Sequence, residues 1–186
     1  MTDHTDLRVI KTLDAIHSTL ETMICEMDYQ SISVTELCEH ARINKKTFYR
    51  YYTSLDELQA EFRSEMASAY IELTKEFRFP RDIPKVSKVF FEFLEYKPVY
   101  SHITCAPSYG LKQKRLTDIV PDDHWKDSPA LANLPASEQS LVIAYVRSMG
   151  AAIYRQWVTD GRKVPIERAI EITAILQSQG LSAMLS

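Results

Sequence analysis

Apolar residues recur at three- and four-residue steps along most of this chain, and that spacing constrains the fold more than any other feature. Between residues 7 and 27 the apolar face of a helix is marked by Val9, Ile10, Leu13, Ile16, Leu20, Met23, Ile24 and Met27. The 186 residues include eight prolines and four glycines, which favours helices over hairpin-rich sheet. We therefore predict an all-α protein, long enough for one substantial domain or a small module joined to a larger one.

Several classes of protein find little support in the sequence. The N-terminus lacks the apolar core of a signal peptide and no apolar run is long enough to span a membrane, so we expect a cytoplasmic protein without a membrane partner. Cys25, Cys38 and Cys105 are widely spaced, which suits buried thiols in a reducing compartment. The five histidines show no metal-ligand spacing, and there is no phosphate-binding glycine loop. We expect no metal, no cofactor and no enzymatic activity.

Two short helices joined by a tight turn follow the first helix. Ser33 and Glu36 form an S-x-x-E capping box at the start of one, and Asn44 is placed to cap the next, predicted over residues 45–51. The connection between them is only Arg42-Ile43-Asn44. A second S-x-x-E sequence at Ser54 predicts a long helix continuing to Phe77. This arrangement is a helix-turn-helix pattern, and we predict a DNA-binding domain over residues 1–54 with a connecting helix over 55–77.

The segment ARINKKTFYRYY, residues 41–52, carries four cations, three tyrosines and no acid in a chain of net charge -3. In a helix-turn-helix the second helix enters the major groove of double-stranded DNA, so Lys45, Lys46, Thr47 and Arg50 would face the duplex. Phe48 and Tyr52 would turn inward. Cations replace condensed counterions and hydroxyls donate to phosphate oxygens, which explains why both occur together here. Arg42 completes the predicted set of cations at the operator.

The sequence SISVTELCEHARINKKTFYRYYTSLDEL resembles the helix-turn-helix of TetR-type transcriptional regulators. The resemblance rests on the T-hydrophobic-Y-x-x-Y pattern of residues 47–52 and on the S-x-x-E-L start at residues 54–58. It implies that Thr47, Tyr49 and Tyr51 contact phosphates, that Arg50 reads a base, and that Thr35 lies near a phosphate. The segment RSMGAAIYRQWVTDG, residues 147–161, is similar to the penultimate helix of one branch of this family.

Prolines 80 and 84 interrupt the helical pattern and mark the start of a second part, residues 78–186. Residues 77–109 hold eight of the nineteen aromatic residues of the chain, which suits either plain core packing or a pocket for a small apolar or aromatic effector. The predicted pocket residues are Phe90, Phe93, Tyr100, His102, Tyr109, Trp125, Arg147 and Tyr154. Residues 117–137 are predicted to form a loop with a short helical piece around Trp125.

Two closing helices are predicted over residues 137–160 and 165–179, and together they form a candidate homodimer interface. Small residues near Gly150 would allow another helix to approach closely, with larger side chains around them. The predicted interface residues are Leu141, Tyr145, Gly150, Ile153, Trp157 and Ile170. The resemblance also implies a helical dimerisation and effector domain.

We predict a sequence-specific transcriptional regulator, most readily a repressor that binds a palindromic operator as a homodimer and is modulated by an effector. Two alternatives remain open at this point. One is a DNA-binding coactivator or adaptor that is controlled by a protein partner. The other is an all-α enzyme with a site around Tyr100, His102 and Arg147.

Overall fold

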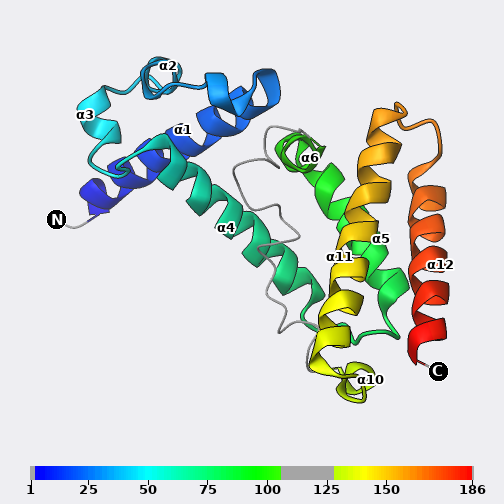
Figure 1. Ribbon diagram of the computed structural model, residues 1–186. Coiled ribbons are helices and arrows are strands. Elements are labelled where there is room, and N and C mark those ends of the chain that lie inside the picture. Colours follow the sequence, from blue (N-terminus) through cyan, green and yellow to red (C-terminus); the bar gives the residue numbers. More distant parts are fainter. Residues whose placement is uncertain (1–2, 106–127, 186) are drawn as a thin grey trace.

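The computed structural model describes residues 3–105 and 128–185, and within these ranges every regular element is a helix, as predicted. The elements are α1 (Asp3–Glu26), η1 (Tyr29–Ser31), α2 (Val34–His40), α3 (Lys45–Phe48), α4 (Leu55–Thr74), α5 (Ile83–Tyr96), α6 (Pro98–Cys105), α10 (Pro129–Ala132), α11 (Ala136–Thr159) and α12 (Ile166–Leu185). Figure 1 shows α1 to α3 at one end, α5, α11 and α12 side by side at the other, and α4 running between them. No described helix is long and apolar enough to cross a membrane.

The predicted helix starts depend on local side-chain contacts that the structure largely confirms. At α2 the Glu36 amide donates to Ser33 Oγ at 3.2 Å and the Ser33 amide donates to the Glu36 carboxylate at 3.1 Å, so both halves of the capping box form. At α4 the Glu57 amide donates to Ser54 Oγ at 3.1 Å. The Glu57 carboxylate accepts from the Thr53 amide rather than from the Ser54 amide, so only one half of a capping box forms at this helix.

Several helix boundaries differ from the prediction, among them the start of α1, which lies at Asp3 rather than at residue 7. α3 ends at Phe48 rather than residue 51, because Arg50 and Tyr51 donate to carbonyls three residues back and tighten the last turn toward 3-10 geometry. α4 ends at Thr74 and α12 continues to Leu185. The helical piece predicted around Trp125 lies outside the described residues, and a short helix, α10, occurs at Pro129–Ala132.

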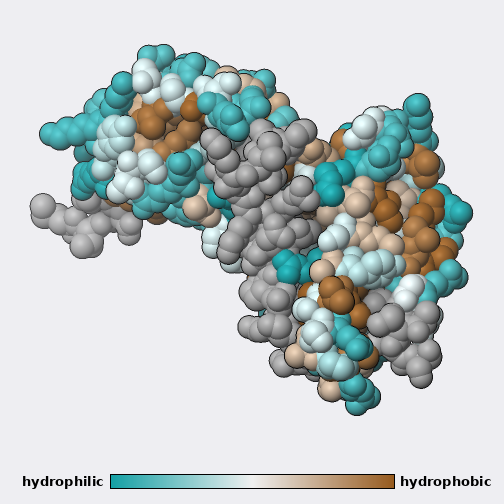
Figure 2. Space-filling view, in the orientation of Figure 1, coloured by the Kyte–Doolittle hydropathy of each residue, from teal (hydrophilic) through white to brown (hydrophobic). Residues whose placement is uncertain are grey.

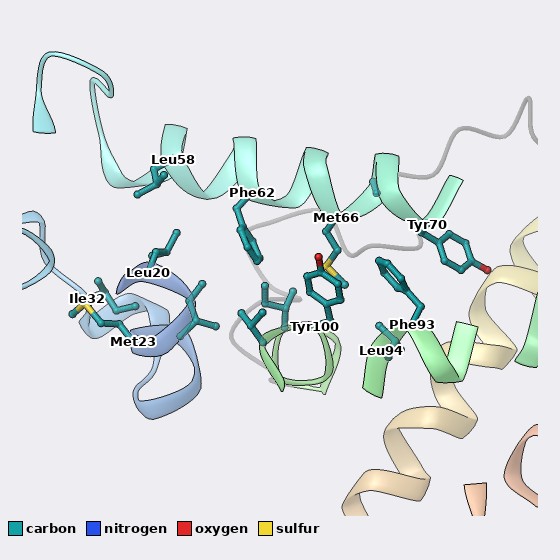
Figure 3. Close-up of a cluster of buried hydrophobic side chains, with 14 of the residues drawn as sticks. Leu20, Met23, Ile32, Leu58, Phe62, Met66, Tyr70, Phe93, Leu94 and Tyr100 are labelled. Carbon is teal, nitrogen blue, oxygen red and sulfur yellow. The ribbon is translucent and has the colours of Figure 1, made fainter. Parts of the chain in front are cut away.

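One apolar core runs through both ends of the described structure. From α4, Phe62 and Met66 face the rings of Tyr100 on α6 and Phe93 on α5, while Leu58 lies nearer Leu20 of α1 (Figure 3). The rings of Phe93 and Tyr100 stack with their centroids 4.8 Å apart. Because α4 and α6 both contribute to this core, the N-terminal helices pack against the rest of the protein and are not joined to it by the chain alone.

Between α4 and α5 the chain turns around Asp82, a carboxylate that is only 4% exposed. It accepts hydrogen bonds from Arg81 and the Arg78 amide at 2.9 Å and lies 3.0 Å from Lys85 Nζ. These donors, Arg81 foremost, hold the pKa of the Asp82 carboxyl well below its usual range. The proline-rich break predicted at this point therefore has a defined structure.

Candidate nucleic-acid interface

The turn between α2 and α3 has the hydrogen bonds of a Schellman motif. The Ile43 amide donates to the Cys38 carbonyl at 2.9 Å and the Arg42 amide donates to the Glu39 carbonyl at 3.2 Å. Arg42 occupies the left-handed position of this motif with φ 54°, where glycine is usual. The turn therefore fixes the backbone that leads into α3 and leaves the Arg42 side chain exposed.

α3 is anchored by its cap and by Phe48. The Thr47 amide donates to Asn44 Oδ1 at 2.8 Å, which confirms the predicted cap. Phe48 is completely buried, and its ring lies 5.7 Å from that of Tyr52, which is 4% exposed. Both residues point inward as predicted. With this side of the short helix held in the core, the opposite side faces solvent.

Most of the predicted DNA-contacting side chains are exposed to solvent. Thr35, Arg42, Lys45, Lys46, Tyr49 and Arg50 are exposed, whereas Thr47 and Tyr51 are half-buried. The Arg50 guanidinium lies 5.9 Å from the centre of the Tyr51 ring, within cation-π range. The Thr47 hydroxyl donates to Asn44 Oδ1 at 3.0 Å. To donate to a DNA phosphate, this hydroxyl would have to give up its hydrogen bond to Asn44.

The positive charge at this surface is not neutralised by neighbours. Arg42, Lys45, Lys46 and Arg50 take part in no ion pair with any residue of 3–105 or 128–185. Four unpaired cations on and beside one turn of helix suit a polyanion such as the DNA backbone. The surface formed by α3 and the turn before it is therefore positively charged.

His17 was not recognised in the sequence as part of the support for α3. Its Nε2 lies 2.7 Å from the Tyr52 hydroxyl, and that hydroxyl also lies 3.4 Å from Glu61 of α4. The contact joins α1, the end of the α3 segment and α4. The available signal was the position of His17, directly after Ile16 on the apolar face of the first predicted helix.

The predicted pocket residues that the structure describes divide into two groups. Phe90, Phe93, Tyr100 and Tyr154 are buried and in ring contact with one another or with their neighbours, as in a packed core. His102 on α6 and Arg147 on α11 are half-buried, and these two with Tyr100 are also the residues of the enzymatic alternative. Among residues 3–105 and 128–185, no cluster of histidine, cysteine or acidic side chains could hold a metal. Tyr109 and Trp125 lie outside the described residues.

The predicted interface residues are also divided by the structure. Leu141 is 71% exposed and Tyr145 37% exposed on α11, whereas Ile153 and Ile170 are half-buried. Gly150 and Trp157 are buried inside the protomer. A Cβ at Gly150 would lie 3.6 Å from Gln177 of α12, and Trp157 Nε1 donates to the Val164 carbonyl at 2.7 Å. These two residues therefore pack α11 within its own chain.

Comparison with known proteins adds a likeness of fold. No protein-family model matches the chain, and no curated protein matches it by sequence. Among solved structures, the dihydroxyacetone kinase operon activator DhaS is similar, with a TM-score of 0.55 and 18% sequence identity. The similarity covers 92% of this chain and 97% of that chain. The shared fold therefore extends well beyond the helix-turn-helix, into the C-terminal helices.

Proposed function

We propose that this chain is a TetR-type transcriptional regulator that binds double-stranded DNA through α2 and α3. The observation that carries the proposal is the arrangement of α3 and the residues that follow it. Phe48 is buried, whereas Lys45, Lys46 and Arg50 are exposed and form no ion pair with any residue that the structure describes. In this role Arg50 reads base edges, and Tyr49, Thr47 and Tyr51 contact the backbone. The fold shared with an operon activator supports the same class of function.

We propose that the regulator binds a palindromic operator as a homodimer formed through α11 and α12. Leu141, Tyr145, Ile175 and Leu176 are large apolar residues that remain exposed on these helices, and Figure 2 shows apolar side chains gathered on the visible face over α11 and α12. A two-fold axis would bring the same patch from two copies together. Light scattering at micromolar concentration should give a dimer, and a monomer with intact DNA binding would contradict this assembly.

Repression by occupation of a promoter is the first form of control that we propose, with release by a small apolar or aromatic effector. The effector would have to favour one separation of the two DNA-binding domains. A second form is activation, and the description of DhaS as an operon activator favours it. A reporter gene placed behind the selected operator distinguishes the two, because deletion of the regulator raises expression in the first case and lowers it in the second.

Selection of genomic DNA fragments by the purified protein, followed by affinity measurements across a salt series, tests the proposed DNA binding. We expect the logarithm of the affinity to fall linearly with the logarithm of salt concentration, and Lys45→Ala to reduce that slope by about one unit. Glu39→Ala, an exposed substitution on the neighbouring helix α2, is the control for the loss of a side chain without the loss of a cation. If the wild-type protein enriches no fragment and binds random DNA without salt dependence, the proposed function is wrong.

A further inference from the structure

The corner between α5 and α6 makes polar contacts with two distant parts of the molecule. On one side of the corner, Lys97 Nζ lies 2.8 Å from Glu21 Oε1 on α1. On the other side, Glu95 contacts Arg162 in the turn between α11 and α12. Glu95 and Lys97 are two residues apart, so one short segment touches both the N-terminal domain and the C-terminal hairpin.

The Lys97–Glu21 contact is well placed to hold α1. The two side chains are 38% and 28% exposed, so solvent screens their attraction less than at an open surface. The hydrogen bond to Glu21 raises the pKa of Lys97, which keeps its charge. The ammonium group also lies 5.7 Å from the centre of the Tyr100 ring, and that ring stacks on Phe93 in the core. Lys97 therefore contacts both the Glu21 carboxylate and the Tyr100 ring.

The Arg162 contact has the geometry of a strong ion pair. Arg162 donates to the two carboxylate oxygens of Glu95 at 2.9 and 3.2 Å, the bidentate arrangement that adds directional specificity. Tyr154 of α11 also donates to Glu95, and it lies 2.8 Å from Ser101 Oγ on α6. Arg162 holds φ at 56°, a left-handed conformation that is unfavourable for a residue with a side chain. The α11–α12 turn is thereby fixed to both α5 and α6.

We propose that the α5–α6 corner sets the orientation of the DNA-binding domain relative to the α11–α12 hairpin, with Lys97 as the positioning residue for α1. A displacement of the hairpin would move Arg162 and with it Glu95, and the α5–α6 corner would carry that movement through Lys97 to Glu21. This inference rests on the proposed function, because in a homodimer the orientation of each DNA-binding domain determines the distance between two recognition helices.

The test measures the preferred spacing of the two operator half-sites, a property that a merely stabilising contact would not set. Affinity is compared between the selected operator and versions lengthened by one and two base pairs at the centre. Lys97→Met should lower the preference for the natural spacing by about 3- to 10-fold, while the affinity for a single half-site stays unchanged. Lys97→Arg keeps the charge and should retain the preference, and the exchange Glu21→Lys with Lys97→Glu should restore much of it.

Lys88→Met is the matched control. It removes an exposed lysine of α5 whose Nζ lies 3.8 Å from Glu92 of the same helix, so the ion pair that is lost does not involve α1. It should leave the spacing preference at the wild-type value. If Lys97→Met also leaves that preference unchanged, or if Lys97→Arg loses it as fully as Lys97→Met does, Lys97 does not position α1 through its charge and the inference is overturned.

A second measurement decides the inference even if the wild-type protein selects no DNA and the proposed function fails. Spin labels at Glu39→Cys on α2 and Gln156→Cys on α11, with Cys25 and Cys105 replaced by serine, report the distance between the two parts within one protomer when labelled protein is diluted with unlabelled protein. Lys97→Met should broaden this distance distribution relative to the otherwise identical labelled protein. An unchanged distribution would contradict the coupling.

Discussion

The hydroxyl of Tyr52 lies 2.7 Å from Nε2 of His17. Tyr52 follows α3 and packs on Phe48, whereas His17 belongs to α1, so this contact ties the recognition segment to the first helix. Burial, together with the carboxylate of Glu61, raises the pKa of Tyr52 and keeps the phenol protonated. The short α3 thus depends on side chains outside the helix-turn-helix for its position.

Tyr52→Phe removes the hydroxyl from this contact and leaves the ring in place. We expect the free energy of unfolding to fall by about 0.5–1.5 kcal/mol, with no change in the preference between operator and random DNA. Chemical denaturation with and without the substitution measures the effect. Tyr96→Phe, at a tyrosine that is 78% exposed, should change stability much less, and equal effects at the two positions would contradict the role of the His17 contact.

Gln59 of α4 is completely buried, and neither atom of its amide group has a hydrogen-bond partner within residues 3–105 and 128–185. Burial of an unpaired amide is unfavourable, so Gln59→Met, which keeps a similar length, should raise the free energy of unfolding by about 1–3 kcal/mol. Gln30→Met, at an exposed position, should change it by less than about 0.5 kcal/mol. A loss of stability on Gln59→Met would show that the amide group makes a favourable interaction in solution.

Arg42→Gly should separate stability from DNA binding. Glycine adopts the left-handed conformation of this turn without strain, but it also gives the unfolded chain more freedom, so stability should change by less than about 1 kcal/mol. DNA affinity should fall, with a salt slope smaller by about one unit, because a cation is lost. Fluorescence anisotropy across a salt series checks the affinity. An unchanged slope would mean that Arg42 does not contact a phosphate.

Asp82→Asn should make stability less sensitive to acid. The folded protein holds the pKa of Asp82 below its value of about 3.9 in the unfolded chain, so its carboxylate stabilises the fold fully above about pH 4 and progressively less as the pH falls below that value. The wild-type protein should be more stable than Asp82→Asn at pH 6, and the gap should narrow by pH 3. Denaturation at both pH values measures the gap, and Asp14→Asn on the exposed face of α1 controls for the loss of one carboxylate.

The features that the sequence predicted well are those that depend on neighbouring residues. The caps at Ser33 and Asn44 form because the partner atoms are within three residues of each other. The inward positions of Phe48 and Tyr52 follow from one turn of helical spacing. Even here the carboxylate of Glu57 bonds to Thr53 rather than Ser54, because two adjacent amides lie within reach of one flexible side chain.

Contacts between distant segments leave no such pattern. Lys97 meets Glu21 across 76 positions, and Arg162 meets Glu95 across 67, so neither pair is visible from local spacing. α11 is apolar on more than one face, and periodicity alone does not indicate which face packs inside the protomer. That is why Gly150 and Trp157, predicted at an interface between copies, are buried against their own chain.

The measurement that most directly tests the central claim compares operator and random DNA affinity for Arg50→Ala and Tyr49→Phe across a salt series. Arg50, two residues after α3, is exposed, and the neighbouring Tyr49 is 55% exposed. Arg50→Ala should cost about 1–3 kcal/mol on the operator and much less on random DNA, since a bidentate base contact is lost. Tyr49→Phe should weaken both by similar factors, because a phosphate contact carries no base information. If Arg50→Ala left the operator-to-random ratio unchanged while Tyr49→Phe collapsed it, the proposed reading of DNA by α3 would be contradicted.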